Sequence, residues 1–124
     1  MKKRRATIIV ENEQGILLTR MKTEPWLLPG GMAERNEPRI IAAIRELYEE
    51  TKLMATDVTF LFEHESQKYY HKVFLIKVEG TPTPSNEVTS LTYYSVNNTD
   101  LNALVQRSSL EIIQNYLSLK SGVQ

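Results

Sequence analysis

Residues 31–53 constrain this chain more than any other part of the sequence. An α-helix turns about 100° per residue, so Glu46, Glu49 and Glu50 would fall within an arc of roughly 100° on such a helix. Like charges at this spacing repel each other by a few tenths of a kcal/mol per pair. A hard divalent cation would offset that repulsion, because such ions bind carboxylate oxygens. The pattern therefore predicts a helix that presents a cation site on one face.

The same segment predicts where the helix lies and which side it buries. We expect it to run from about Pro38 to Thr51, because proline suits the first turn of a helix, with Asn36 or Glu37 as the N-cap. The side opposite the carboxylates carries an apolar stripe that we expect to be buried. This stripe consists of Ile40, Ile41, Ile44, Leu47, Tyr48 and Thr51.

The spacing resembles the Nudix box, written G-x5-E-x7-R-E-U-x-E-E-x-G-U, where U is a bulky aliphatic residue. The matching residues are Gly31, Glu37, Arg45, Glu46, Leu47, Glu49, Glu50 and Leu53. Lys52 stands where the family has its second glycine. The preceding stretch, residues 26–31 (WLLPGG), is similar to the lead-in of these enzymes. With its flanks, the resemblance covers roughly the first two-thirds of the chain.

This resemblance implies a fold and a metal site. The fold is α/β, with a mixed β-sheet sandwiched between α-helices; the residue pattern alone gives α/β or α+β. The implied cofactor is Mg²⁺ or Mn²⁺, and the implied metal ligands are Glu46, Glu49 and Glu50, with the carbonyl of Gly30 as a further ligand. A solvated acidic helix face without a metal is the non-functional interpretation of the same charges.

Other residues are expected to support the catalytic residues of the box. By resemblance, Arg45 and Glu37 hold the carboxylates in place through charge-assisted hydrogen bonds, and Gly31 supports the site. The general base varies in this family between a box glutamate and a later acidic residue. Glu87 is the candidate for the latter, although an exposed loop carboxylate explains it equally well. Lys52 would cost roughly 1 kcal/mol in a left-handed helix end, where its ammonium would suit the helix dipole.

Three residues are candidates for substrate binding. Tyr69 and Tyr70 follow the box at about the distance at which a tyrosine marks the diadenosine-polyphosphate branch of the family, and a tyrosine could stack on a base. Tyrosines are also common in strands, so this marker alone does not select a substrate. Arg20, at the end of an expected strand, could meet a phosphate or could lie at a solvated edge.

The composition bounds the class of protein. The 124 residues predict a single domain, residues 1–124, and the 41% hydrophobic content favours a soluble globular fold. A net charge of zero argues against broad binding to nucleic acid or membrane. The basic residues 2–5 are expected to form a solvated tail, with nucleic-acid binding as the less favoured role. Without cysteine, a signal peptide or an apolar run of about 20 residues, the chain is expected to be cytoplasmic and not membrane-bound.

Further elements follow from local patterns. Strands at 6–10 and 16–20, joined by a turn at 11–15, predict a hairpin. Three more strands are expected at 58–63, 72–78 and 91–96. Ser108 or Ser109 is expected to cap a last helix. Its apolar residues at helical spacing are Leu110, Ile113, Tyr116 and Leu117.

Taken together, the sequence predicts a Mg²⁺-dependent Nudix hydrolase. Its substrate would be a nucleoside diphosphate derivative, such as a nucleoside triphosphate, whose diphosphate linkage is cleaved by attack of water on phosphorus. A diadenosine-polyphosphate hydrolase is the alternative within the class, and a non-catalytic nucleotide-sensing domain is the alternative from another class. The intact acidic positions favour an active enzyme. The expected partner is a small-molecule nucleotide, and a homodimer is possible because dimers are common in this family.

Overall fold

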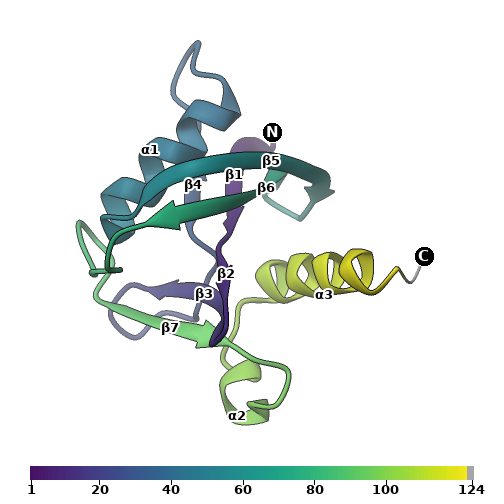
Figure 1. Cartoon of the computed structure of the whole chain (residues 1–124). Helices are drawn as coiled ribbons and strands as arrows, with labels where there is room; N and C mark the ends of the chain where they lie inside the picture. The colour runs from purple at the N-terminus through teal and green to yellow at the C-terminus, as the bar shows by residue number, and fades with distance from the viewer. Residues whose placement is uncertain (123–124) are drawn as a thin grey trace.

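Two β-sheets and the helices around them make up residues 1–122, the part of the chain that the computed structural model describes (Figure 1). The elements, in chain order, are β1 (Lys3–Ile9), β2 (Glu11–Asn12), β3 (Gly15–Arg20), β4 (Gly30–Met32), α1 (Arg39–Thr51), β5 (Met54–Glu65), β6 (Tyr69–Glu79), β7 (Ser90–Tyr94), α2 (Thr99–Asn102) and α3 (Arg107–Ser121).

The larger sheet is mixed, and the smaller one is antiparallel. The larger has the strand order β4-β1-β6-β5, in which β1 runs parallel to β6 and antiparallel to β4. Strands β5 and β6 form a long antiparallel pair. The smaller sheet has the order β2-β3-β7. This topology leaves β4 at one edge of the larger sheet, next to α1.

Alternation along β1 divides the core into two parts. Successive side chains of a strand point to opposite faces. Ala6 and Ile8 pack with Ala42, Ala43 and Leu47 of α1 in one buried cluster. Ile9 belongs to the other cluster, with Ile112, Ile113 and Tyr116 of α3. The sheets therefore lie between α1 and α3 (Figure 1), and the expected α/β arrangement with helices on both sides is confirmed.

The expected hairpin between residues 6–10 and 16–20 is wrong in its pairing. Strand β1 pairs with β4 and β6, whereas β3 pairs with the two-residue β2 and with β7. The chain passes from one sheet to the other between β1 and β2, so the short hairpin occupies a separate sheet. A local pattern of two strands and a turn does not reveal this change of partner.

The prediction that the whole apolar stripe of α1 is buried is also wrong. Leu47 and Thr51 are buried, together with Ala42 and Ala43. The remaining residues of the stripe are between 36% and 50% exposed; they are Ile40, Ile41, Ile44 and Tyr48. Glu46 and Glu50, expected opposite the buried side, are partly buried because their helical positions fall beside Ala42 and Ala43. The two small alanines permit a close approach to the sheet.

Both helix caps differ from expectation. The N-cap of α1 is Pro38, whose side chain makes no capping hydrogen bond, so neither Asn36 nor Glu37 has that role. The N-cap of α3 is Gln106, whose side chain accepts from the backbone N–H of Ser109 at 3.2 Å.

Strand β1 starts at Lys3, so the basic residues 2–5 do not form a tail. Among the described residues, no helix has both the length and the apolar character needed to span a bilayer.

Helix α1 ends at Lys52 in the left-handed conformation, with φ 62°. Its backbone N–H donates to the carbonyl of Tyr48 at 2.9 Å, the bond of a left-handed helix end. The ammonium lies 4.8 Å from the centroid of the Tyr48 ring, on the exposed side of α1. Such an exposed cation–π contact contributes about 0.5–1 kcal/mol, which partly offsets the cost of the backbone. The side chain therefore does not turn toward the carboxylates.

Substitution of Lys52 should separate the backbone cost from the side-chain contact. Lys52→Gly should raise the free energy of unfolding by up to about 1 kcal/mol, because glycine adopts positive φ without strain. Lys52→Ala loses the ammonium without relieving the backbone, so it should be about 1 kcal/mol less stable than the glycine variant. Equilibrium urea unfolding of the three proteins measures this difference. Equal stability of the glycine and alanine variants would show that the positive φ carries no cost here.

Candidate active site

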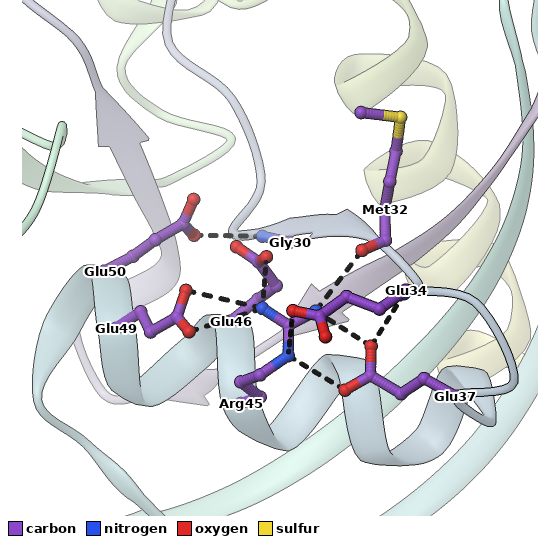
Figure 2. Close-up of polar contacts among 8 residues, drawn as sticks. All are labelled: Gly30, Met32, Glu34, Glu37, Arg45, Glu46, Glu49 and Glu50. Atoms are coloured by element: carbon purple, nitrogen blue, oxygen red, sulfur yellow. Dashed lines mark hydrogen bonds and ion pairs between the residues drawn. The ribbon is translucent and has the colours of Figure 1, made fainter.

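Arg45 lies at the centre of the polar cluster on α1 (Figure 2). Its Nε and Nη2 donate to the two carboxylate oxygens of Glu37 at 2.8 and 2.9 Å, a bidentate contact that fixes the guanidinium plane. Its Nη1 donates to Glu46 at 2.9 Å and to Glu49 at 3.3 Å. Nη2 also donates to the carbonyl of Met32 at 3.3 Å. One cation therefore hydrogen-bonds to three carboxylates and to strand β4, and it lies 3.8 Å from a fourth carboxylate, that of Glu34.

The pairing with Glu37 keeps this cluster charged. Glu37 lies in the loop between β4 and α1, and it also accepts from the backbone N–H of Glu34 at 2.9 Å. The hydrogen bonds from Arg45, and secondarily from Glu34, lower the pKa of Glu37 to about 2. The bond to Glu37 in turn raises the pKa of Arg45 above its ordinary value. Glu37 thus anchors the guanidinium that contacts Glu46 and Glu49.

Glu50 differs from its neighbours because it forms no ion pair among residues 1–122. One of its oxygens accepts from the backbone N–H of Gly30 at 3.1 Å. Burial raises the pKa of Glu50 to about 7, against the lowering effect of the Gly30 hydrogen bond. Burial also raises the pKa of Glu46, although Arg45 opposes it. Two partly buried carboxylates thus lie side by side with too little positive charge to balance them.

A hard divalent cation fits this donor set. Glu46, Glu49 and Glu50 supply anionic oxygens, the ligands that Mg²⁺ and Mn²⁺ prefer. The partial burial of Glu50 without an ion pair to any residue from 1 to 122 is the observation that favours such an ion. No three acidic or histidine side chains already converge on one point in the described part of the chain. Because Nη1 of Arg45 holds Glu46 and Glu49, metal binding would require these side chains to turn toward Glu50.

Paired glycines make room for the carboxylates. A Cβ on Gly31 would lie 2.4 Å from Cδ of Glu46, so only a residue without a side chain allows this carboxylate to lie against β4. A Cβ on Gly30, which has φ 150°, would lie 2.2 Å from the carbonyl oxygen of Ala6 in β1. Gly30 therefore permits the close pairing of β4 with β1, and Gly31 leaves space for the carboxylate of Glu46.

Glu87 lies in the loop between β6 and β7 and is exposed. Two hydrogen bonds tie this loop to the end of α1. The N–H of Thr83 donates to the carbonyl of Thr51 at 2.8 Å, and the N–H of Ser85 donates to that of Glu50 at 3.1 Å. The loop therefore starts beside the helix end that carries Glu50.

The three candidates for substrate binding lie at different places. Arg20 lies over Trp26, with its Cζ 5.2 Å from the ring centroid, beside a separate cavity of about 260 Å³. Tyr69 lines a larger cavity of about 520 Å³. Tyr70 is exposed and lies 5.6 Å from the ammonium of Lys2. Within the described residues, no hydrogen bond or ion pair joins these three side chains to the Arg45 cluster.

Arg5 is the residue of this region that the sequence analysis missed. It lies in β1 opposite Met32 of β4 and His71 of β6, and it is partly buried. Its charge interacts with those of Glu50 and Glu46. Extending the alternation of β1 back to Lys3 would have placed Arg5 on the same side as Thr7 and Ile9, and not in a tail.

Comparison with known proteins agrees with this geometry. A family model described as NUDIX domain matches residues 1–116. The chain belongs to the Nudix family. Members of this family are pyrophosphohydrolases, so the protein is a hydrolase of phosphoric anhydride bonds. No curated protein sequence matches the chain.

Solved structures of Nudix proteins share this fold. A crystal structure from Chromobacterium violaceum, assigned to the Nudix hydrolase family, has 36% sequence identity and a TM-score of 0.88, and the match covers 97% of this chain and 79% of that one. A MutT structure, from a study of the Aliivibrio salmonicida and Vibrio cholerae enzymes, has 18% identity and a TM-score of 0.78 over 96% of this chain and 99% of that one.

A third similar structure is a bifunctional NMN adenylyltransferase/ADP ribose pyrophosphatase from Francisella tularensis, in complex with AMP and a Mn ion. It has 19% identity and a TM-score of 0.74, and the match covers 95% of this chain and 42% of that one. At these identities, the MutT and Francisella proteins show the Nudix fold alone.

The two glycines of this Nudix protein should respond differently to alanine. Gly30→Ala places a Cβ against backbone atoms that cannot move independently, so it should lower the melting temperature by several degrees. Gly31→Ala meets only the side chain of Glu46, so it should keep the fold and lower the hydrolysis rate at least tenfold. Calorimetry and a hydrolysis assay on both variants measure these effects. Wild-type activity in Gly31→Ala would show that the position of Glu46 against β4 is unimportant.

Proposed function

We propose that this Nudix hydrolase uses Mg²⁺ or Mn²⁺ to cleave the diphosphate linkage of a nucleoside diphosphate derivative, such as a nucleoside triphosphate. The observation that carries the proposal is the partly buried carboxylate of Glu50, which has no ion-pair partner in the described part of the chain and lies beside Glu46. This arrangement is unfavourable for the protein alone, and a divalent ion with a bound diphosphate would complete it.

The proposed ligands of the ion are Glu46, Glu49, Glu50 and the carbonyl of Gly30. When bound, the ion would neutralise charge on the diphosphate and activate a water for attack on phosphorus. Arg45 would hold Glu46 and Glu49 near the site until these carboxylates turn toward the ion, and Glu37 would keep Arg45 in place.

Glu87 is the proposed general base. The box carboxylates would be engaged as metal ligands, which leaves none free to take a proton from water. Glu87 is the only acidic residue between Gly80 and Val96, and its loop begins at the end of α1 that carries Glu50. Closure of this exposed loop over bound substrate would bring Glu87 to the attacking water.

The substrate within the class is not determined by the carboxylates, because they recognise metal and diphosphate. Tyr69 lines the cavity of about 520 Å³, where a base could stack on its ring, so it keeps a diadenosine polyphosphate among the candidates. Arg20 and Tyr70 remain proposed binding residues that only a large substrate would reach. The homodimer that the resemblance implies stays a prediction.

The proposal is tested by chromatography of the products from a panel of nucleotides with and without Mg²⁺, because cleavage of a diphosphate linkage yields a nucleotide and a phosphorylated remainder or pyrophosphate. The panel should contain nucleoside triphosphates, ADP-ribose and diadenosine polyphosphates. Mg²⁺-dependent hydrolysis of at least one compound is the expected result. Tight nucleotide binding without hydrolysis of any compound would instead identify a non-catalytic nucleotide-sensing domain.

Glu50→Gln should lower the hydrolysis rate by orders of magnitude and leave the fold intact. The substitution removes an anionic metal ligand but keeps the shape and helix propensity of the side chain. Because burial already disfavours the charged form of Glu50, the melting temperature should not fall. Steady-state kinetics with Mg²⁺ and a thermal melt measure both effects, with the exposed Glu13→Gln as the matched control. Near-normal turnover in Glu50→Gln would rule out the proposed metal site.

Glu87→Gln should lower kcat by about 100-fold or more, with little change in substrate binding, because the amide cannot accept the proton of the attacking water. Kinetics over a pH series measure kcat and KM for this variant. Glu79→Gln removes an exposed carboxylate at the end of β6 and serves as the control. Wild-type kcat at every pH would leave Glu87 as a surface residue and return the base role to the box.

A further inference from the structure

Arg5 combines partial burial with a charge that no ion pair satisfies within residues 1–122. Within the described residues, its guanidinium makes one hydrogen bond, from Nη2 to the backbone carbonyl of Leu28 at 3.3 Å. A guanidinium has five N–H donors, so most of them remain available. Arg45 is the opposite case, because four acceptor residues use its donors.

The electrostatic surroundings of Arg5 are those of the proposed metal site. Burial lowers the pKa of its guanidinium, and the negative charges of Glu50 and Glu46 oppose this effect. These carboxylates are near enough to interact but too far to form an ion pair. A bound cation would neutralise them, which would leave the positive charge of Arg5 without compensation. An anionic ligand could then supply the missing charge.

Arg5 lies beside a residue that lines a cavity. The guanidinium is 5.8 Å from the centroid of the Tyr69 ring, and Tyr69 lines the cavity of about 520 Å³. Leu28, which accepts from Arg5, donates its own N–H to Oγ of Ser109 at 3.1 Å. Ser108, next to Ser109 in the chain, and Gln106, the N-cap of α3, line the same cavity. Arg5 is therefore close to both the carboxylates and the cavity.

We propose that Arg5 is a substrate-binding residue that donates to non-bridging phosphate oxygens of the diphosphate group. The planar guanidinium matches phosphate oxygens in a two-pronged geometry. With the diphosphate held between the box carboxylates and Arg5, the group attached to it would extend toward the cavity beside Tyr69. This assignment rests on the proposed function, because it takes a diphosphate as the ligand.

Methylenediphosphonate is a diphosphate mimic that cannot be hydrolysed at its bridge. Because it carries no nucleobase, its binding reports on recognition of the diphosphate group alone. Isothermal titration calorimetry in Mg²⁺ should give a Kd at least tenfold higher for Arg5→Gln than for the wild type. Arg4→Gln removes the same charge from the next, exposed position of β1 and should change the Kd less than twofold. In the wild type, the Nε–H signal of Arg5 should shift in NMR spectra on titration, whereas that of Arg4 should not.

Several results would overturn the assignment. These are an unchanged Kd in Arg5→Gln, an equal loss in Arg4→Gln, no binding by the wild type, or an unmoved Arg5 signal. The NMR titration uses the unaltered protein, so it decides the question even if Arg5→Gln folds poorly. Failure of the proposed function is recognised separately. Arg5-dependent diphosphate binding without hydrolysis of any nucleotide would refute catalysis alone, and hydrolysis with unchanged binding would refute the Arg5 assignment alone.

Discussion

The site depends on the close approach of strand β4 to both β1 and α1. Gly30 lies against the backbone of Ala6, and Gly31 lies against the carboxylate of Glu46. A side chain at either position would push apart elements that carry the polar cluster. Because the approach is set by backbone atoms, the carboxylates are positioned by the packing of the fold and not by flexible loops. Such positioning is required when a site must hold several like charges at short range.

Charge balance explains the rest of the arrangement. Arg45 is shared among three carboxylates, which limits their repulsion while no other cation is bound. Within residues 1–122, the carboxylate of Glu50 accepts only the backbone N–H of Gly30 and forms no ion pair. Arg5 supplies positive charge from the neighbouring strand without contacting the carboxylates. The folded chain thus places Arg5 near the carboxylates of Glu46 and Glu50 without an ion pair between them in residues 1–122.

The sequence predicted the features that local spacing determines. The position of α1 and the left-handed end at Lys52 followed from residues close together in the chain. The buried side of α1 could not be predicted, because four large apolar residues outweighed Ala42 and Ala43 in the pattern. The orientation of α1 is decided by how those alanines pack against the sheet and how the carboxylates fit against Gly30 and Gly31 of β4. The partnership of β1 with β6 depends on residues more than sixty positions apart, and Arg5 was assigned to a tail for the same reason.

The hydrogen bonds of β4 have a consequence for self-association. As the edge strand of its sheet, β4 presents backbone groups that could pair with a strand of another molecule. The N–H of Gly30 is taken by Glu50, and the carbonyl of Met32 is taken by Arg45. These side chains of α1 thereby cover the sheet edge as well as forming the polar cluster. Two backbone groups of β4 are thus already bonded to side chains of the polar cluster, which leaves fewer of them free for pairing with a strand of another molecule.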